Sequence, residues 1–328
     1  MKNAVVLLIC LWGLTGCRQS VVYRYAEGKI YGTFYHISYA SSGDLHREIR
    51  ERMEAVNASL SMFNPHSVIA KINRNESNRT DSLFRKMFDM AQEVYRQTEG
   101  GYDITVAPLV NAWGFGVGQK DFPDSARVDS LLLLVGMDKL RLVGEELIKA
   151  LPEMKLDASS IAKGLGVDLV AEYLEEKGVA DYMVEIGGEV RVKGQSGKGR
   201  PWRIGIDRPE DDATGERRQL QMVAELVSGA LATSGNYRNF YLHEGKKYAH
   251  TINPRTGFPV QTEILSASVC APSCMEADAY ATGFMVVGLE KAKEIICRQP
   301  NLEGCLIYEV DGKINVWISD GLKRLLVS

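Results

Sequence analysis

Hydrophobic residues recur at helical spacing in several parts of the chain. Across residues 45–60, apolar side chains stand three or four positions apart, which places them on one face of an amphipathic helix. Residues 83–94 repeat this pattern, and the pair Gly100-Gly101 follows as a helix stop. A third helix is predicted over residues 159–177. These segments are expected to pack their apolar faces against a common core.

Other segments are rich in β-branched and aromatic residues and are bounded by turn residues, as is typical of strands. Strands are predicted over residues 30–39, 182–192, 202–207, 222–231 and 265–270. Residues 277–297 are expected to form a further helix, and Asp311-Gly312 is expected to join two strands in a hairpin. This mixed order predicts an α+β fold, in which mixed, largely antiparallel sheets pack against helices.

The N-terminus differs from the rest of the chain. A single charge, Lys2, precedes an apolar run from Ala4 to Leu14 that is too short to span a membrane as a helix. The run ends in Leu14-Thr15-Gly16-Cys17, which resembles the processing site of bacterial lipoproteins. We therefore expect acyl chains such as palmitate on Cys17.

This segment determines the predicted domain organisation and location. Residues 1–16 are expected to be a signal peptide, residues 17–28 a lipidated tether, and residues 29–328 one continuous body. The protein is then an exported bacterial lipoprotein that faces the periplasm and is held on a membrane through the lipid on Cys17.

Composition excludes several classes of protein. Of 328 residues, 45% are hydrophobic and 25% charged, which argues against a disordered chain and against a polytopic membrane protein. With 39 Lys+Arg against 42 Asp+Glu, the net charge of -3 offers no electrostatic reason to expect nucleic acid. The spacing of the last four cysteines matches no common zinc pattern, and an exported location permits a disulfide without requiring one. These are Cys270, Cys274, Cys297 and Cys305.

A first candidate site lies at the start of the predicted third helix. Asp157 and small residues lead into this helix, where free backbone N–H groups favour an anion, and Lys163 adds a positive charge. A phosphate group fits such a position. The alternative is that Asp157 or Ser159 only caps the helix.

A second candidate site lies on the predicted helix 277–297. Asp278 and Thr282 are four residues apart and share one helix face, so a carboxylate and a hydroxyl can both bind Mg²⁺. A third protein oxygen could be a carbonyl of the Ser160 turn. The alternative is that Asp278 and Thr282 are solvated surface residues, although the Ala and Met residues around them imply burial.

Two further segments combine reactive or aromatic residues with turns. His250 precedes the tight turns of residues 253–257, where it could act as a general base, contact a phosphate, or serve only the structure. Aromatic residues beside glycines, in 101–105, 111–116 and at Phe63, suit the stacking of a flat ring, and core packing would explain them as well.

Taken in order, these motifs resemble the ApbE family of FAD:protein FMN transferases. They are YGTFYHISY, LSMFNPHSVIAKIN, GYDITVAPLVNAWGFG, LDASSIAKGLGVD, VEIGGEVRVKG, ALATSGNYRN, HTINPRTGFP and ADAYATGFMVVG. The resemblance implies a T-fold-related body and an Mg²⁺-dependent enzyme with FAD as its substrate. It implies transfer of FMN, through a phosphoester bond, to a Ser or Thr hydroxyl of an exported electron-transfer protein, with release of AMP.

The same resemblance assigns roles to single residues. It places the metal on Ser160, Asp278, Ala281 and Thr282, and the assisting histidine at His250. It places FAD on Tyr31, Phe63, Gly101, Tyr102, Asp103, Asp157, Lys163 and Ile252. Two positions depart from the family pattern: Tyr31 stands where Met is common, and Asn236 where a carboxylate is common.

Two other functions use the same residues. With water as the acceptor, the site would hydrolyse the FAD pyrophosphate to FMN and AMP. Without chemistry, the protein would be a flavin-binding lipoprotein.

Overall fold

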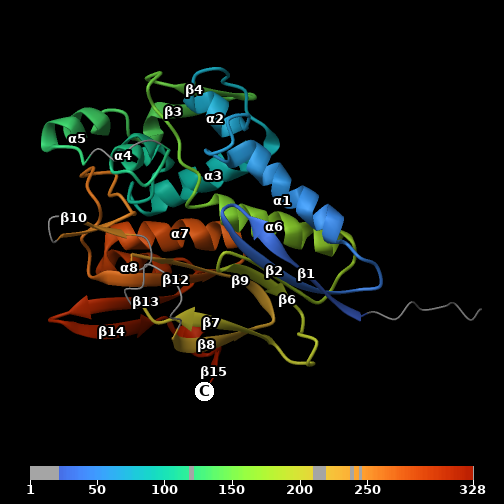
Figure 1. Cartoon of the computed structure of the whole chain (residues 1–328). Coiled ribbons are helices and arrows are strands. Elements are labelled where there is room, and N and C mark those ends of the chain that lie inside the picture. The colour runs from blue at the N-terminus through green and yellow to red at the C-terminus, as the bar shows by residue number, and fades with distance from the viewer. Residues whose placement is uncertain (1–21, 118–121, 210–218, 237–239, 244–245, 328) are drawn as a thin grey trace, which may run out of the picture.

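An eight-stranded sheet forms the centre of the molecule, and each strand is antiparallel to its neighbours (Figure 1). Its strands, in spatial order, are β1 (Val22–Ile30), β2 (Thr33–Ser41), β5 (Tyr182–Ile186), β6 (Glu189–Lys193), β9 (Ser228–Gly235), β12 (Ile264–Ala271), β13 (Glu303–Val310) and β14 (Lys313–Ile318). A three-stranded sheet contains β15 (Leu326–Val327), β8 (Leu220–Leu226) and β7 (Trp202–Asp207). Two hairpins are β3 (Leu140–Val143) with β4 (Glu146–Lys149), and β10 (Phe240–His243) with β11 (Lys246–Ala249).

Helices cover one face of the large sheet, and the three-stranded sheet packs on the other (Figure 1). The longer helices are α1 (His46–Leu60), α3 (Ser82–Gln97), α6 (Ala162–Glu176), α7 (Cys274–Val287) and α8 (Leu289–Arg298). The shorter ones are α2 (Val68–Asn73), η1 (Ile104–Val106), α4 (Ala107–Ala112), α5 (Ser125–Leu132), η2 (Met137–Lys139) and α9 (Asp320–Lys323). Helices α6 and α7 lie side by side on the sheet, and α1 and α3 pack on them from outside. The predicted α+β fold with largely antiparallel sheets is confirmed.

The structure describes residues 22–117, 122–209, 219–236, 240–243 and 246–327. The predicted signal peptide and Cys17 lie outside these ranges. Strand β1 (Val22–Ile30) pairs with β2, so residues 22–28 belong to the sheet, while the predicted division into signal peptide, tether and body stays a prediction. None of the described helices has the length and hydropathy that a membrane span requires.

Several predicted elements divide in the structure because of glycines with positive φ. The predicted strand 30–39 contains the turn between β1 and β2, where Gly32 has a φ of 74°. The predicted strand 182–192 is the β5–β6 hairpin, which turns at Gly187 and Gly188. Similarly, Gly288, with a φ of 81°, separates α7 from α8. The left-handed region favours glycine, so these residues mark chain reversals inside apolar runs.

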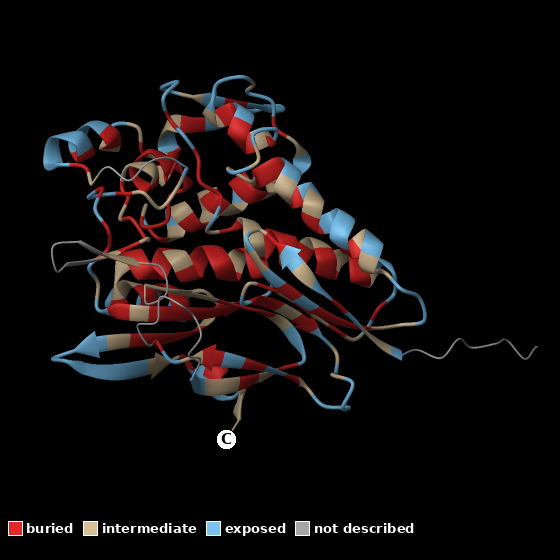
Figure 2. Cartoon of the chain, viewed as in Figure 1, coloured by how far each residue is buried: buried red, intermediate tan, exposed pale blue. Residues whose placement is uncertain are grey.

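Helix α7 is buried along nearly its whole length (Figure 2). It packs on β9 and β12 beneath it, on α6 at its side and on α3 above it. A helix enclosed in this way has no polar face, which explains why its sequence lacks a clear amphipathic pattern. Asp278, a charged residue on α7, is therefore carried into the interior.

The start of α7 is held by α6. The carboxylate of Asp168 accepts hydrogen bonds from the backbone N–H groups of Cys274 and Met275, both at 2.9 Å, and pairs with Arg191 at 2.8 Å. A negative charge at a helix N-terminus is stabilising. These bonds determine where α7 begins relative to α6.

The two helices also approach closely at Gly164. A Cβ atom at this position would lie 2.4 Å from the carbonyl oxygen of Cys274, which is backbone and cannot rotate away. We expect Gly164→Ala to lower the free energy of unfolding by at least about 1 kcal/mol, since overpacking outweighs the gain in helix propensity. Urea denaturation measures this change. The control is Gly43→Ala, at a position with no atom within 4 Å, and equal stabilities of the two variants would contradict the close approach.

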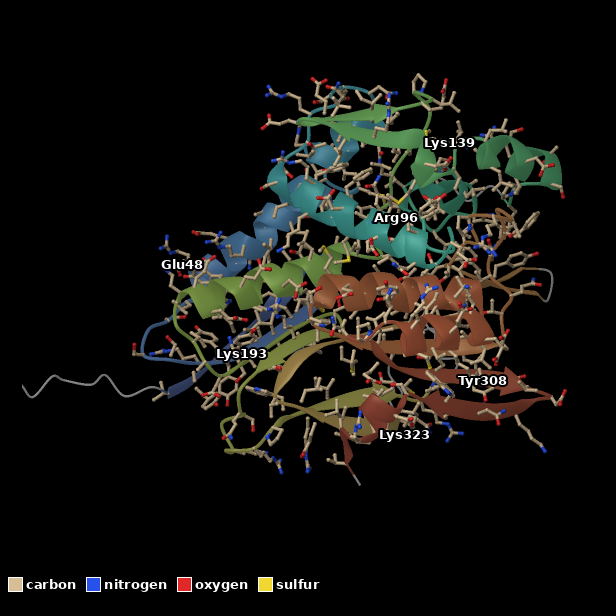
Figure 3. All side chains as sticks on the ribbon, turned by 180° about the vertical axis from the view of Figure 1, so that it is seen from behind. Glu48, Arg96, Lys139, Lys193, Tyr308 and Lys323 are labelled. Atoms are coloured by element: carbon tan, nitrogen blue, oxygen red, sulfur yellow. The ribbon has the colours of Figure 1, made fainter. Side chains whose placement is uncertain are left out.

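The outer surface carries side chains of both charges (Figure 3). Lys193 pairs with Glu175 at 2.8 Å, and Lys323 pairs with Asp320 at 3.0 Å. The four cysteines of the body are all free thiols in this structure: Cys270, Cys274, Cys297 and Cys305. None of them forms the disulfide that an exported location would permit.

Candidate active site

A cavity of about 630 Å³ is lined by residues of the helical layer, of the large sheet and of β7. Its size is typical of a pocket for a small molecule or cofactor. Most of the predicted site residues line it, although they are far apart in the sequence: Phe63, Gly101, Tyr102, Asp103, Asp157, Ser160, Lys163, His250, Ile252, Asp278 and Thr282. The fold therefore brings the four candidate segments of the sequence into one site.

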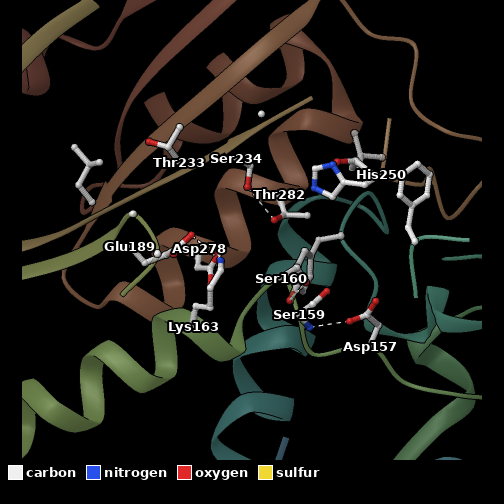
Figure 4. A pocket seen from close by; sticks show the side chains of 18 of the residues that line it. Asp157, Ser159, Ser160, Lys163, Glu189, Thr233, Ser234, His250, Asp278 and Thr282 are labelled. Atoms are coloured by element: carbon white, nitrogen blue, oxygen red, sulfur yellow. Dashed lines mark hydrogen bonds and ion pairs between the residues drawn. The ribbon is translucent and has the colours of Figure 1, made fainter. Parts of the chain in front are cut away.

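Lys163 lies between two buried carboxylates, one of which is Asp278 (Figure 4). Its Nζ is 2.7 Å from Glu189 Oε1 and 3.9 Å from Asp278 Oδ1. Burial alone would lower the pKa of Lys163, but the charges of Asp278 and Glu189 raise it above its usual range. The lysine therefore stays protonated in the cavity.

Glu189 did not emerge from the sequence as a site residue. Its side chain is 5% exposed, and burial raises its pKa to about 7 although Lys163 opposes this shift. Its Oε2 atom has no hydrogen-bond partner among the described residues. The sequence feature that could have identified Glu189 was weak: it is a charged residue at the start of an apolar strand, directly after Gly187-Gly188.

Asp278 and Thr282 stand one turn apart on α7 and both face the cavity. Asp278 is 3% exposed, so the alternative that this pair is solvated surface is wrong. Asp278 Oδ2 accepts a hydrogen bond from the N–H of Gly164 at 3.0 Å, and Thr282 Oγ1 lies 3.0 Å from Ser234 Oγ. Burial raises the pKa of Asp278, while Lys163 and the Gly164 N–H lower it.

The N-terminus of α6 does not have the simple helix cap that the sequence left open as an alternative. The N-cap residue is Ile161, without a side-chain hydrogen bond, so neither Asp157 nor Ser159 caps the helix. Asp157 Oδ1 instead accepts from the N–H of Ser159 at 2.7 Å, and Ser160 Oγ donates to the Tyr102 hydroxyl at 3.1 Å. The first-turn N–H of Gly164 binds the carboxylate of Asp278, so this donor holds a protein carboxylate where a phosphate was predicted.

His250 follows β11 and lines the same cavity. In the view of Figure 4, Asp278 and Thr282 lie between His250 and Glu189. The imidazole ring makes an edge contact with Phe115, at 6.3 Å between centroids. Asn236 is outside the cavity lining and accepts a hydrogen bond from Thr251 Oγ1 at 2.9 Å, so it has a structural partner.

The remaining lining residues shape the rim and the wall. Asp103 accepts hydrogen bonds from the N–H groups of Thr105 and Met137, and burial raises its pKa to about 6. Gly101 is closely packed, since a Cβ atom there would lie 2.3 Å from a methyl carbon of Val287. Phe63 is 72% exposed and offers an open aromatic face at the cavity.

Two predicted residues lie outside the lining. Tyr31 is in the β1–β2 turn, where its hydroxyl donates to the carbonyl of Met53 at 2.7 Å and its ring packs against Gly166. The side chain of Tyr31 thus fills the space between α1 and α6, and its contact with FAD stays a prediction. Ala281 is fully buried in α7 and does not line the cavity either.

The residues present fit a bound Mg²⁺ ion. No cluster of three or more His, Cys, Asp or Glu suited to a metal occurs in the described part of the chain. Mg²⁺ does not require one, because it is usually held by one or two carboxylates together with water and substrate phosphates. Six carboxylates line the cavity against two basic side chains, Lys163 and Arg203, so a cation is favoured there. The acidic residues are Asp103, Asp157, Glu185, Glu189, Asp207 and Asp278.

Comparisons with known proteins find relatives along nearly the whole chain. Two relatives, each described as "FAD:protein FMN transferase", are 36% identical: one from Vibrio cholerae, covering 99% of both chains, and one from Haemophilus influenzae, covering 98% of this chain and 97% of the relative. The solved structure "Flavin Transferase ApbE from Vibrio cholerae" superposes with a TM-score of 0.84 at 34% identity, covering 93% of this chain and all of that one. The Pseudomonas stutzeri flavinyl transferase ApbE, covering 93% and 97%, gives 0.82 at 28% identity. The ApbE family profile matches residues 31–306, and the chain belongs to the ApbE family.

Proposed function

We propose that this protein transfers FMN from FAD to a Ser or Thr hydroxyl of an acceptor protein, in an Mg²⁺-dependent reaction that releases AMP. The observation that carries the proposal is the cavity in which Lys163, Asp278 and Thr282 meet His250. An acidic cavity binds an anionic dinucleotide only if cations compensate its carboxylates. The protonated Lys163 together with a metal ion supplies that compensation.

The reaction is a substitution at phosphorus. The acceptor oxygen forms a bond to the FMN phosphorus, the bond from that phosphorus to the bridging oxygen breaks, and AMP leaves with the bridging oxygen. The hydroxyl proton passes to a base, for which His250 is the candidate. Lys163 stabilises the negative charge that develops on the phosphate oxygens.

Mg²⁺, when bound, supplies further charge neutralisation at the pyrophosphate. Asp278 and Thr282 would hold it with oxygen ligands, and oxygens of Ser160 and Ala281 are further candidates. Tyr102, Asp103 and Asp157 would line the FAD site beside them, and Phe63 would stack on one of its rings.

The cellular setting is part of the proposal. With an acylated Cys17, the enzyme acts as an exported lipoprotein at a membrane surface, facing the periplasm. Its partner is then an exported redox protein, such as an electron-transport subunit, that presents a Ser or Thr hydroxyl.

A transfer assay tests the function. The full-length protein in detergent is incubated with FAD, Mg²⁺ and an exported flavin-acceptor domain, and we expect flavin fluorescence on the acceptor band of a denaturing gel, with AMP released in equal amount. AMP release that does not depend on acceptor would instead identify a pyrophosphate hydrolase. FAD binding without AMP release would identify a flavin-binding lipoprotein and overturn both enzyme functions.

A further inference from the structure

Glu189 is a buried carboxylate with one oxygen bonded and the other unused. Oε1 binds the Lys163 ammonium at 2.7 Å, while Oε2 has no partner among the described residues. A buried carboxylate normally has hydrogen bonds to both oxygens, since leaving one without a donor costs free energy. Oε2 itself has almost no solvent-accessible surface, but Glu189 lines the cavity, so a bound molecule can supply the missing donor after a small movement of this side chain.

Apart from the backbone N–H of Glu189 itself, whose hydrogen bond lowers the pKa of the Glu189 carboxyl, the neighbouring protein groups do not supply that donor. The backbone N–H of Gly188 is bonded to Glu185 Oε1 at 2.7 Å, and Asp278 on the other side of Lys163 is itself a carboxylate. The ammonium of Lys163 lies against Oε1. The donor must therefore come from a bound molecule, and the O–H groups of FAD and of a Ser or Thr acceptor are donors of this kind.

We propose that Glu189 binds a substrate hydroxyl: its Oε1 holds Lys163 against the cavity wall, and its Oε2 accepts a hydrogen bond from an aliphatic O–H of a bound substrate. This inference rests on the proposed function, which places two sources of such a group in the cavity. One is the polyol chain of FAD, and the other is the acceptor's Ser or Thr hydroxyl. Glu189 is thus a binding and positioning residue.

Glu185 provides a matched control in the same cavity. It is two residues before Gly187 and also lines the cavity, but both of its oxygens are used. Oε1 accepts from Gly188 N–H, and Oε2 lies 2.7 Å from His36 Nδ1. A carboxylate that is already satisfied by the protein has no hydrogen bond left for a substrate.

The test compares Glu189→Gln with Glu185→Gln in the full-length protein. The amide keeps the size of the side chain, and its carbonyl oxygen remains available to Lys163, but the charge-assisted bond to the substrate is lost. We expect about a tenfold loss in one of two constants, the Kd for FAD or the KM for the acceptor domain at saturating FAD. The Kd is measured by quenching of flavin fluorescence without acceptor.

The outcomes separate the two sources of the hydroxyl. A raised Kd for FAD assigns the bond to the polyol chain, and an unchanged Kd with a raised acceptor KM assigns it to the acceptor. If both constants stay within twofold of wild type, or if only kcat falls, the inference is overturned. A comparable loss in Glu185→Gln would also overturn it.

Folding and the proposed function are checked separately. Thermal unfolding shows whether Glu189→Gln folds. The variant Glu189→Asp keeps the charge but places the carboxylate oxygens farther from the cavity. Its Kd for FAD and its KM for the acceptor are measured in the same way, and we expect the same loss as in Glu189→Gln. A wild-type protein that transfers no FMN would refute the proposed function. The Kd for FAD then decides the inference, because the polyol chain is the remaining source of the hydroxyl.

Discussion

Replacing Asp278 with asparagine is expected to lower the rate of FMN transfer at least about a thousandfold, because the charged oxygen proposed to bind Mg²⁺ is lost. The fold should remain intact. The amide oxygen can still accept from the Gly164 N–H, and Lys163 keeps its 2.7 Å bond to Glu189. Removing a charge that is 3% exposed also removes a desolvation cost. The transfer assay, a calorimetric Mg²⁺ titration and a thermal melt measure the three effects.

Glu276 provides the control on the same helix. It is two residues before Asp278, partly buried, and outside the cavity lining. Glu276→Gln should change transfer and Mg²⁺ affinity less than about twofold, as expected for a surface substitution away from the site. Transfer by Asp278→Asn at more than a tenth of the wild-type rate, at equal Mg²⁺, would contradict the role of Asp278.

Replacing Lys163 with methionine is expected to lower both activity and stability. Glu189 and Asp278 would become buried carboxylates without a counter-ion, which should cost about 3 kcal/mol of unfolding free energy. Transfer should fall about a hundredfold, because the cavity would repel the pyrophosphate and lack a charge at the developing phosphate oxygens. Urea denaturation and the transfer assay measure these losses.

Two comparisons isolate the cause of this effect. Lys86 pairs with Glu172 at the same 2.7 Å, but the two side chains are 40% and 42% exposed, so Lys86→Met should cost less than about 1 kcal/mol. In the double variant Lys163→Met/Glu189→Gln, one unpaired charge is removed, so more than half of the lost stability should return while activity stays low. A double variant as unstable as Lys163→Met would show that the buried charge is not the cause.

Local sequence pattern was sufficient for the elements that have one exposed and one buried face. The predicted helix 45–60 corresponds to α1 (His46–Leu60), and the predicted strand 202–207 corresponds to β7. In both, the periodicity of apolar residues reports directly on burial. The hairpin at Asp311-Gly312 was also correct, because positive φ at both residues suits the turn type they favour.

The pattern of apolar residues did not predict element boundaries where an element is enclosed on all sides or where a turn lies inside an apolar run. The predicted helix 277–297 divides into α7 and α8, since burial makes both faces of α7 apolar and hides the break at Gly288. The predicted strand 182–192 divides at Gly187-Gly188 for a related reason. Apolar composition there reports burial, and burial alone does not determine where the chain reverses.

For the site, the sequence by itself determined the residue types, their order and the spacing of Asp278 and Thr282 on one helix face. Only the tertiary structure decided which distant residues meet. It brought Glu189 against Lys163, because strand β6 lies beneath α6, and it placed Tyr31 between α1 and α6, outside the cavity lining. The physical reason is that side-chain charge and size are local properties, whereas contact, burial and an unused hydrogen-bond acceptor arise only when separate elements pack together.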